Sequence, residues 1–75
     1  MKRVGEVVRT AQGLAIVRCP EDSRPDIGTV VLDESLSKVG RVVDVFGPVS
    51  HPYVAVTPDD RSALAGLLGG KLYAR

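Results

Sequence analysis

Short runs of β-branched and aliphatic residues alternate with turn-forming residues along the chain, and this pattern predicts a protein made mostly of strands. The expected strands are Val4–Arg9, Leu14–Arg18, Gly28–Leu32, Val42–Phe46, Tyr53–Val56 and Lys71–Tyr73. Between them, Gln12-Gly13 is a plausible turn, residues 19–26 form a polar loop with two prolines, and residues 33–38 form a turn with room for one helical turn.

The stretch from Val39 to Val56 reads as a strand, a stiff turn and a second strand. Gly47 can take backbone angles closed to other residues, and two prolines in the same connector each fix φ. We therefore expect a rigid protrusion rather than a flexible loop. Because it carries the apolar residues Phe46, Val49 and Tyr53, the protrusion is more typical of a docking surface than of a spacer.

One helix is expected after this hairpin. Thr57 can serve as its N-cap, Pro58 suits its first position, and Asp59-Asp60 would face the positive end of the helix dipole. Leucines at 64, 67 and 68 follow at helical spacing, and Gly69-Gly70 would end the helix. Gly66 weakens it by about 1 kcal/mol relative to alanine.

A local pattern of aliphatic residue, glycine, polar residue and two valines occurs three times, starting at Val4, Ile27 and Val39. Glycine near a strand start often marks a bend, a bulge or a close backbone approach, which small closed barrels need at their corners. Valine–glycine pairs are also common in other all-β proteins. We predict one domain, residues 1–75, folded as an all-β, six-stranded closed barrel with one short helix.

The central strands do not alternate cleanly between apolar and polar residues. Simple alternation would place Val43 and Val45 on one face and Val42 and Phe46 on the other. A small barrel has one interior, so part of this apolar surface should face outward and mark an interface. The alternatives are that bulges rotate some residues inward or that the helix covers the outer face.

Composition and charge narrow the function. Ten basic and nine acidic residues are interleaved, the net charge is +1, and there are three aromatic residues. A protein that binds nucleic acid on its own usually shows a basic patch or an aromatic stacking platform, so the composition argues against that class. The single Cys19 excludes an internal disulfide and fits a reducing cytosol. We expect neither a signal peptide nor a membrane span.

Residues that could carry catalysis do not form a recognisable set. His51 is the only histidine, and its neighbour Ser50 need not converge on it. Cys19 has no CxxC partner, and Gly69-Gly70-Lys71 lacks the spacing of a phosphate loop. Asp44 would pair with a nearby arginine such as Arg41 or cap a backbone group at a bulge. We therefore expect no enzyme, no metal site and no cofactor.

The central stretch resembles the signature of the GAR family, the glycine/arginine-rich-protein subunits of H/ACA ribonucleoproteins. The resemblance rests on Val39–Val49 followed by Pro52-Tyr53-Val54, and it extends to Gly5-Glu6-Val7, Gly28–Val31 with Asp33, and Gly70–Tyr73. The run Asp-Val-Phe-Gly-Pro-Val with Pro-Tyr after a short gap is specific. Eukaryotic members carry glycine/arginine-rich tails, so this chain resembles an archaeal-type core without them.

The resemblance implies a barrel of the translation-factor type that is not an enzyme. It implies direct binding to the catalytic subunit of the pseudouridine synthase, with the other H/ACA proteins and the guide RNA as indirect partners, and help in loading substrate RNA and releasing product. Residues expected to bind the partner are Phe46, Gly47, Pro48, Val49 and Tyr53 in the turn, with Pro58, Leu68 and Gly69 beside it. The location would be cytoplasmic. A freestanding RNA-binding barrel is the alternative.

Overall fold

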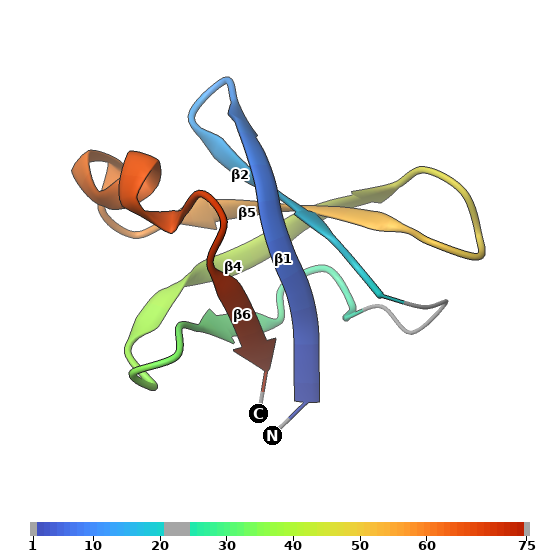
Figure 1. Ribbon diagram of the computed structural model, residues 1–75, viewed down its shortest axis with the longest axis horizontal. Coiled ribbons are helices and arrows are strands. Elements are labelled where there is room, and N and C mark those ends of the chain that lie inside the picture. The colour runs from blue at the N-terminus through green and yellow to red at the C-terminus, as the bar shows by residue number, and fades with distance from the viewer. Residues whose placement is uncertain (1, 21–24, 75) are drawn as a thin grey trace.

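A closed barrel of six antiparallel strands makes up most of the molecule (Figure 1). This computed structural model describes residues 2–20 and 25–74. Its elements are β1 (Lys2–Ala11), β2 (Leu14–Arg18), β3 (Val30–Leu32), β4 (Lys38–Phe46), β5 (Tyr53–Pro58), a 3₁₀ helix η1 (Arg61–Leu67) and β6 (Lys71–Ala74). Around the barrel the strands follow the order β1-β2-β5-β4-β3-β6, and β6 pairs with β1 to close it. The predicted fold class is confirmed.

The strands lie where the sequence pattern predicts them, with differences at their ends. β2 has the predicted bounds, and the turn before it places Gln12 and Gly13 at positive φ. β4 begins at Lys38, earlier than expected, because Lys38–Arg41 pairs with β3. β3 is shorter than predicted, since Gly28 adopts φ +94° in the turn before it. Of the predicted polar loop, residues 21–24 lie outside the described residues.

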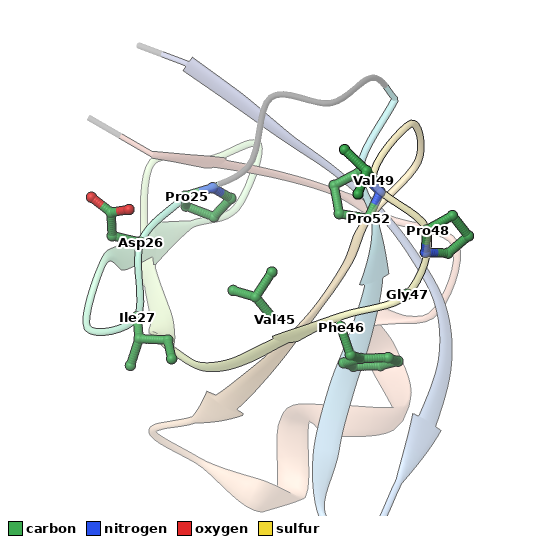
Figure 2. A pocket seen from close by; sticks show the side chains of 9 residues that line it. All are labelled: Pro25, Asp26, Ile27, Val45, Phe46, Gly47, Pro48, Val49 and Pro52. Carbon is green, nitrogen blue, oxygen red and sulfur yellow. The ribbon is translucent and has the colours of Figure 1, made fainter.

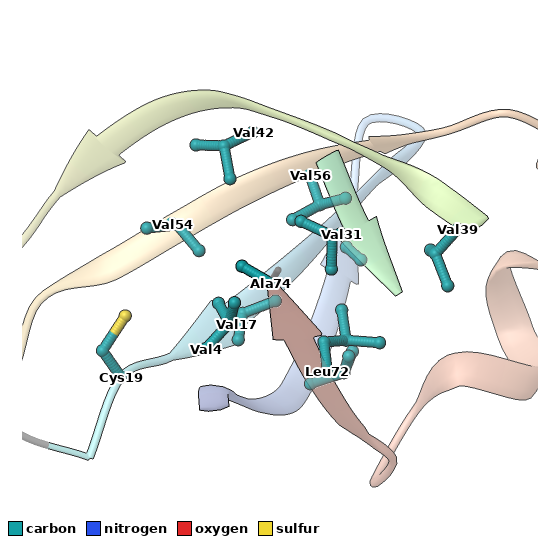
Figure 3. Packing of buried hydrophobic residues seen from close by; sticks show 12 residues of the cluster. Val4, Val17, Cys19, Val31, Val39, Val42, Val54, Val56, Leu72 and Ala74 are labelled. Carbon is teal, nitrogen blue, oxygen red and sulfur yellow. The ribbon is translucent and has the colours of Figure 1, made fainter. Parts of the chain in front are cut away.

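Small apolar side chains fill the barrel interior (Figure 3). They are Val4, Val7, Ala15, Val17, Cys19, Val31, Val39, Val42, Val54, Val56, Leu72 and Ala74. In β2 and β5, alternate residues point inward, so Ile16 and Ala55 lie on the outer face and pair with each other in register. Eight of these twelve interior side chains are valines, which pack well on a curved, pleated wall.

A bulge in β4 decides which residues of the central hairpin face outward. The pairing with β5 passes from Val42 directly to Asp44, so Val43 is an extra residue. Val42 and Val45 therefore point inward, whereas Val43 and Phe46 are each 39% exposed. The expectation that Val43 and Val45 share a face is wrong, because one inserted residue reverses the alternation beyond it.

Two of the three recurrent glycines lie where neighbouring backbones touch. A Cβ added to Gly5 would overlap the carbonyl oxygen of Arg18, and one added to Gly40 would overlap that of Thr57. Gly5 also lies at a bulge between β1 and β6. The third, Gly28, has open space around it and serves a turn instead. The sequence pattern thus marks close approach at two positions and a turn at the third.

The helix begins later than predicted. Thr57 and Pro58 belong to β5 and pair with Arg41 and Gly40, so the chain stays extended past them. Asp60 is the N-cap, and its carboxylate accepts hydrogen bonds from the hydroxyl and the backbone N–H of Ser62. Both bonds lower the pKa of Asp60, and the bond from the hydroxyl has the larger effect. Gly69, at φ +81°, follows the helix end as predicted.

Leu64 and Leu67 of η1 are partly buried against the interior cluster, whereas Leu68 after the helix is exposed. The predicted leucine stripe is therefore confirmed for two of its three members. No helix within residues 2–20 and 25–74 has the length and apolar character needed to cross a membrane.

Replacing two glycines by alanine should show two opposite effects on stability, a steric clash in the folded protein and a lower entropy of the unfolded chain. Gly40→Ala forces a Cβ into the β5 backbone, which cannot move away, and should lower the free energy of unfolding by about 3 kcal/mol. A Cβ added to Gly66, on η1, would meet nothing within 4 Å, so Gly66→Ala should raise the free energy of unfolding by about 0.5–1 kcal/mol. Urea titration of both variants measures the two changes, and equal effects would contradict the backbone contact at Gly40.

Cys19 should react with thiol reagents only when the protein unfolds. Its side chain is buried in the interior cluster, and burial raises the pKa of the thiol. The thiol is therefore neutral and inaccessible in the folded protein, and stability should fall as pH rises above about 8.5, where the unfolded chain loses this proton first. Ellman's reagent with and without urea tests this, and rapid labelling of the folded protein would contradict it.

Candidate functional site

The connection between β4 and β5 projects from one end of the barrel, the right-hand end in Figure 1. Its shape is set at both ends. Gly47 adopts φ +90°, and a Cβ there would lie 2.8 Å from Cδ1 of Tyr53, so glycine is required for both reasons. At the other end Pro52 is buried, and its carbonyl accepts a hydrogen bond of 2.9 Å from the N–H of Cys19. This bond ties the turn to the end of β2.

Phe46 and Tyr53 close the base of the turn. They face each other across β4 and β5, and their rings are stacked with centroids 5.8 Å apart at an interplanar angle of 16°. Neither belongs to the interior cluster, so both lie on the outer surface rather than in the core. Beyond them, Pro48 is exposed and Val49 is 83% exposed. The turn thus presents an apolar surface on a stiff support.

A groove of about 390 Å³ lies between this turn and the loop that leads toward β3 (Figure 2). Its hairpin wall consists of Val45–Val49 and Pro52, and its opposite wall is formed by Pro25, Asp26 and Ile27. Ile27 is 65% exposed, and Val45 points between the two walls. Three prolines line the groove, so little chain entropy remains to be lost when it is covered.

The loop wall and Val45 were missed by the sequence analysis. The signals were present, since Ile27 is an apolar residue next to a turn glycine and Pro25 stiffens the segment before it. Nothing in the sequence shows, however, that this loop comes to lie against a hairpin about twenty residues later. The contact depends on the barrel closing, which is a long-range event.

The eight residues predicted to bind a partner fall into two groups. Five of them (Phe46, Gly47, Pro48, Val49 and Tyr53) lie together at the hairpin turn. Pro58 is the last residue of β5, and Leu68 and Gly69 follow η1, which Figure 1 shows at the opposite end of the molecule. β5 has six residues and carries the chain roughly 20 Å from one end to the other. The expectation that these three lie beside the turn is therefore wrong.

Two of these three residues have structural contacts of their own. The N–H of Gly69 donates a hydrogen bond of 2.8 Å to the carbonyl of Val7, which joins the helix end to β1. Pro58 pairs with Gly40 and is half-buried. Leu68 is exposed and remains available to another molecule. The turn and its groove are therefore the better candidate for a binding surface.

The candidate catalytic residues considered from the sequence lie in different surroundings in the structure. His51 is exposed at the tip of the turn, and Cys19 is buried in the core. Among residues 2–20 and 25–74, no group of three His, Cys, Asp or Glu side chains could hold a metal ion. Lys38 and Asp59 form the one ion pair found in that part of the chain, at 3.5 Å and on the surface.

Asp44 caps a backbone group at the β4 bulge. Its Oδ1 accepts a hydrogen bond of 2.8 Å from the N–H of Val45. Of the two roles expected for Asp44, the bulge cap is the one observed. Among the described residues the ion pair found is Lys38–Asp59, and not Asp44 with Arg41. Beyond Val42, β4 has β5 on one side and the groove on the other, so this cap covers a donor at an open sheet edge.

Removing the cap should make the barrel self-associate. Asp44→Ala leaves the Val45 N–H without its acceptor, and a bare edge donor favours pairing with another chain. We expect sedimentation to show concentration-dependent dimers of Asp44→Ala at least tenfold more abundant than in the unmodified protein. Asp44→Asn keeps an acceptor oxygen and should behave like the unmodified protein. Equal association of both variants would contradict the capping role.

Comparisons with known proteins give a matching family model, a relative and a structural neighbour. Residues 1–74 match the family model described as Gar1/Naf1 RNA binding region. An uncharacterized protein of Methanocaldococcus jannaschii is 40% identical over 50 residues, which cover 67% of this chain and 58% of that protein. A solved structure of the Gar1 domain of Naf1 superposes with a TM-score of 0.73 over 99% of this chain and 81% of its own, at 16% identity. At that identity the structural match shows the fold.

Proposed function

Because the chain belongs to the Gar1/Naf1 RNA-binding-region family, we propose that it is a non-catalytic protein subunit of the H/ACA guide-RNA pseudouridylation complex. In this proposal it binds the catalytic subunit of the pseudouridine synthase directly, and it meets the guide RNA and the other H/ACA proteins through that subunit. The proposed role is to assist substrate loading and product release. We propose a cytoplasmic location for the complex.

The exposed apolar surface on a rigid turn carries this proposal. Val49 is 83% exposed, Phe46 is 39% exposed, and the proline-lined groove lies beside them. Burying such side chains in a partner's pocket is favourable by about 25 cal/mol per Å² of apolar area, and a stiff turn loses little entropy on binding. A few buried anchors of this kind supply most of the affinity at protein interfaces.

The proposed mechanism is a shift between positions of a synthase loop. A bound protein can move such an equilibrium only by binding one position more tightly than the other. Couplings of about 1–3 kcal/mol, or roughly 5–150-fold, are usual. The barrel would then raise multiple turnover more than a single round of modification, because loading and release are the steps it affects. Equal turnover with and without the protein would remove this mechanism.

A freestanding RNA-binding barrel is the second candidate. A hollow of about 340 Å³ on the outer surface places Arg9 together with Phe46 and Tyr53, and such a combination can hold a stacked base near its phosphate. The near-neutral charge and the small number of aromatic residues favour docking to a protein over independent binding of RNA. A gel-shift of the isolated protein against guide RNA separates the two, since strong salt-dependent binding would favour the RNA-binding barrel.

Val49→Asp should weaken binding to the synthase subunit by at least tenfold, because it places a charge in the surface that becomes dry. Leu36→Asp is the matched control. Leu36 is 56% exposed in the β3–β4 turn, and its φ of +67° suits aspartate. Calorimetric titration of the synthase subunit with each variant gives the two affinities. Loss of binding in both variants, or in neither, would contradict docking through the hairpin.

A further inference from the structure

The wall of the barrel opens along the second half of β4. Up to Val42, β4 has a neighbour on both sides, and Val42 itself exchanges hydrogen bonds with the segment before β3: its N–H donates to Thr29 at 2.9 Å and its carbonyl accepts from Gly28 at 2.7 Å. Beyond that point the loop at residues 25–27 diverges and the groove begins. Within the described residues, Val43–Phe46 pairs with β5 alone.

Val45 is the residue that presents its backbone to this opening. Residues of a strand point their N–H and C=O alternately to either side, and the bulge adds one residue to the count. After Val42, the next residue facing the β3 side is therefore Val45. The position of its N–H is consistent with this count, since it donates to the Asp44 carboxylate. The edge thus holds one donor and one acceptor that a neighbouring strand could bind.

The groove along this edge has the chemistry of a strand site. Its floor is the half-buried side chain of Val45, and its walls offer Ile27 and Val49 to apolar side chains. Two carboxylates lie beside it: Asp26 lines the groove, and Asp44 stands at its edge. An occupant with a lysine or arginine next to an apolar residue would complement this arrangement.

We propose that a short extended segment of the synthase subunit adds to the barrel here as an extra strand beside Val43–Gly47. The proposal rests on the proposed function and names the form in which the partner binds. The segment's carbonyl would take the Val45 N–H from Asp44, and its own N–H would donate to the Val45 carbonyl. Asp44, released from its cap, would pair with a basic side chain of the segment. Backbone bonds give such sites affinity, and the side pockets give specificity.

The length of the opening limits the segment. It runs from the last bonded residue, Val42, to the turn at Gly47, a span of roughly 15 Å at about 3.3 Å per residue. A segment of about four or five residues fits, with one apolar side chain facing Val45 and Ile27. Pro48 and Pro52 bound the groove beyond that point, and neither can donate to a ladder.

Amide exchange within the assembled complex tests the proposal. The ¹⁵N-labelled full chain is bound to the unlabelled synthase subunit, and hydrogen–deuterium exchange is followed for Val45 in the free and bound protein. We expect exchange of the Val45 amide to slow at least tenfold on binding. In parallel, Ile27→Asp should weaken the complex at least tenfold, whereas Leu36→Asp, at a site of similar exposure away from the groove, should bind like the unmodified protein.

Each outcome decides between the proposals. A complex in which the Val45 amide exchanges as before, or in which Ile27→Asp binds normally, overturns strand addition and leaves the proposed function standing. Failure to form any complex overturns the proposed function and the added strand together. Slowed exchange of Val45 in the protein alone at high concentration means that a second copy occupies the edge, which also overturns strand addition by the synthase.

Discussion

The narrow interior of the barrel is the constraint on which the rest of the structure depends. A closed sheet of six strands leaves room for one layer of small side chains, and valines supply most of it. Where the wall is tightest, even a Cβ is too large, so glycine stands at Gly5 and Gly40 against the backbones of β2 and β5. Apolar residues beyond this layer have to lie outside.

This constraint explains the surface of the hairpin. The bulge at Val43 turns Val45 inward while leaving Phe46 outside, where it stacks on Tyr53. The connector then holds its shape through Gly47 and the hydrogen bond from Cys19 to Pro52. The exposed apolar groups are therefore fixed in position by the same close packing that excludes them from the core.

The sequence predicts those parts of the fold that depend on neighbouring residues. β2 and its preceding turn follow directly from Gln12-Gly13 and the aliphatic run after them. The helix start is misplaced because Thr57 and Pro58 have good local preferences for it, while the ladder with Gly40 and Arg41 holds them extended. Pairing between distant strands overrides local preference in such cases.

The same distinction applies to the candidate site. Five of its residues are adjacent or nearly so in sequence and were found by their composition. The loop wall at Pro25–Ile27 joins them only after β3 and β4 have paired. The reversal at Val45 depends on a bulge that the sequence allowed but whose position it did not fix. Pro58, Leu68 and Gly69 were misplaced for a related reason: proximity in the chain says little once a strand separates two groups.

The pairing of Lys2 with Ala74 brings the two ends of the barrel wall side by side, as Figure 1 shows. The same pairing of strands could therefore be kept with a different order of connections along the chain. A few linking residues could join these ends, and the chain could be opened at Gln12-Gly13 to give new termini. No pairing between strands would be lost. Such a circular permutant would present the β4–β5 hairpin on an unchanged barrel, with its termini at the β1–β2 turn.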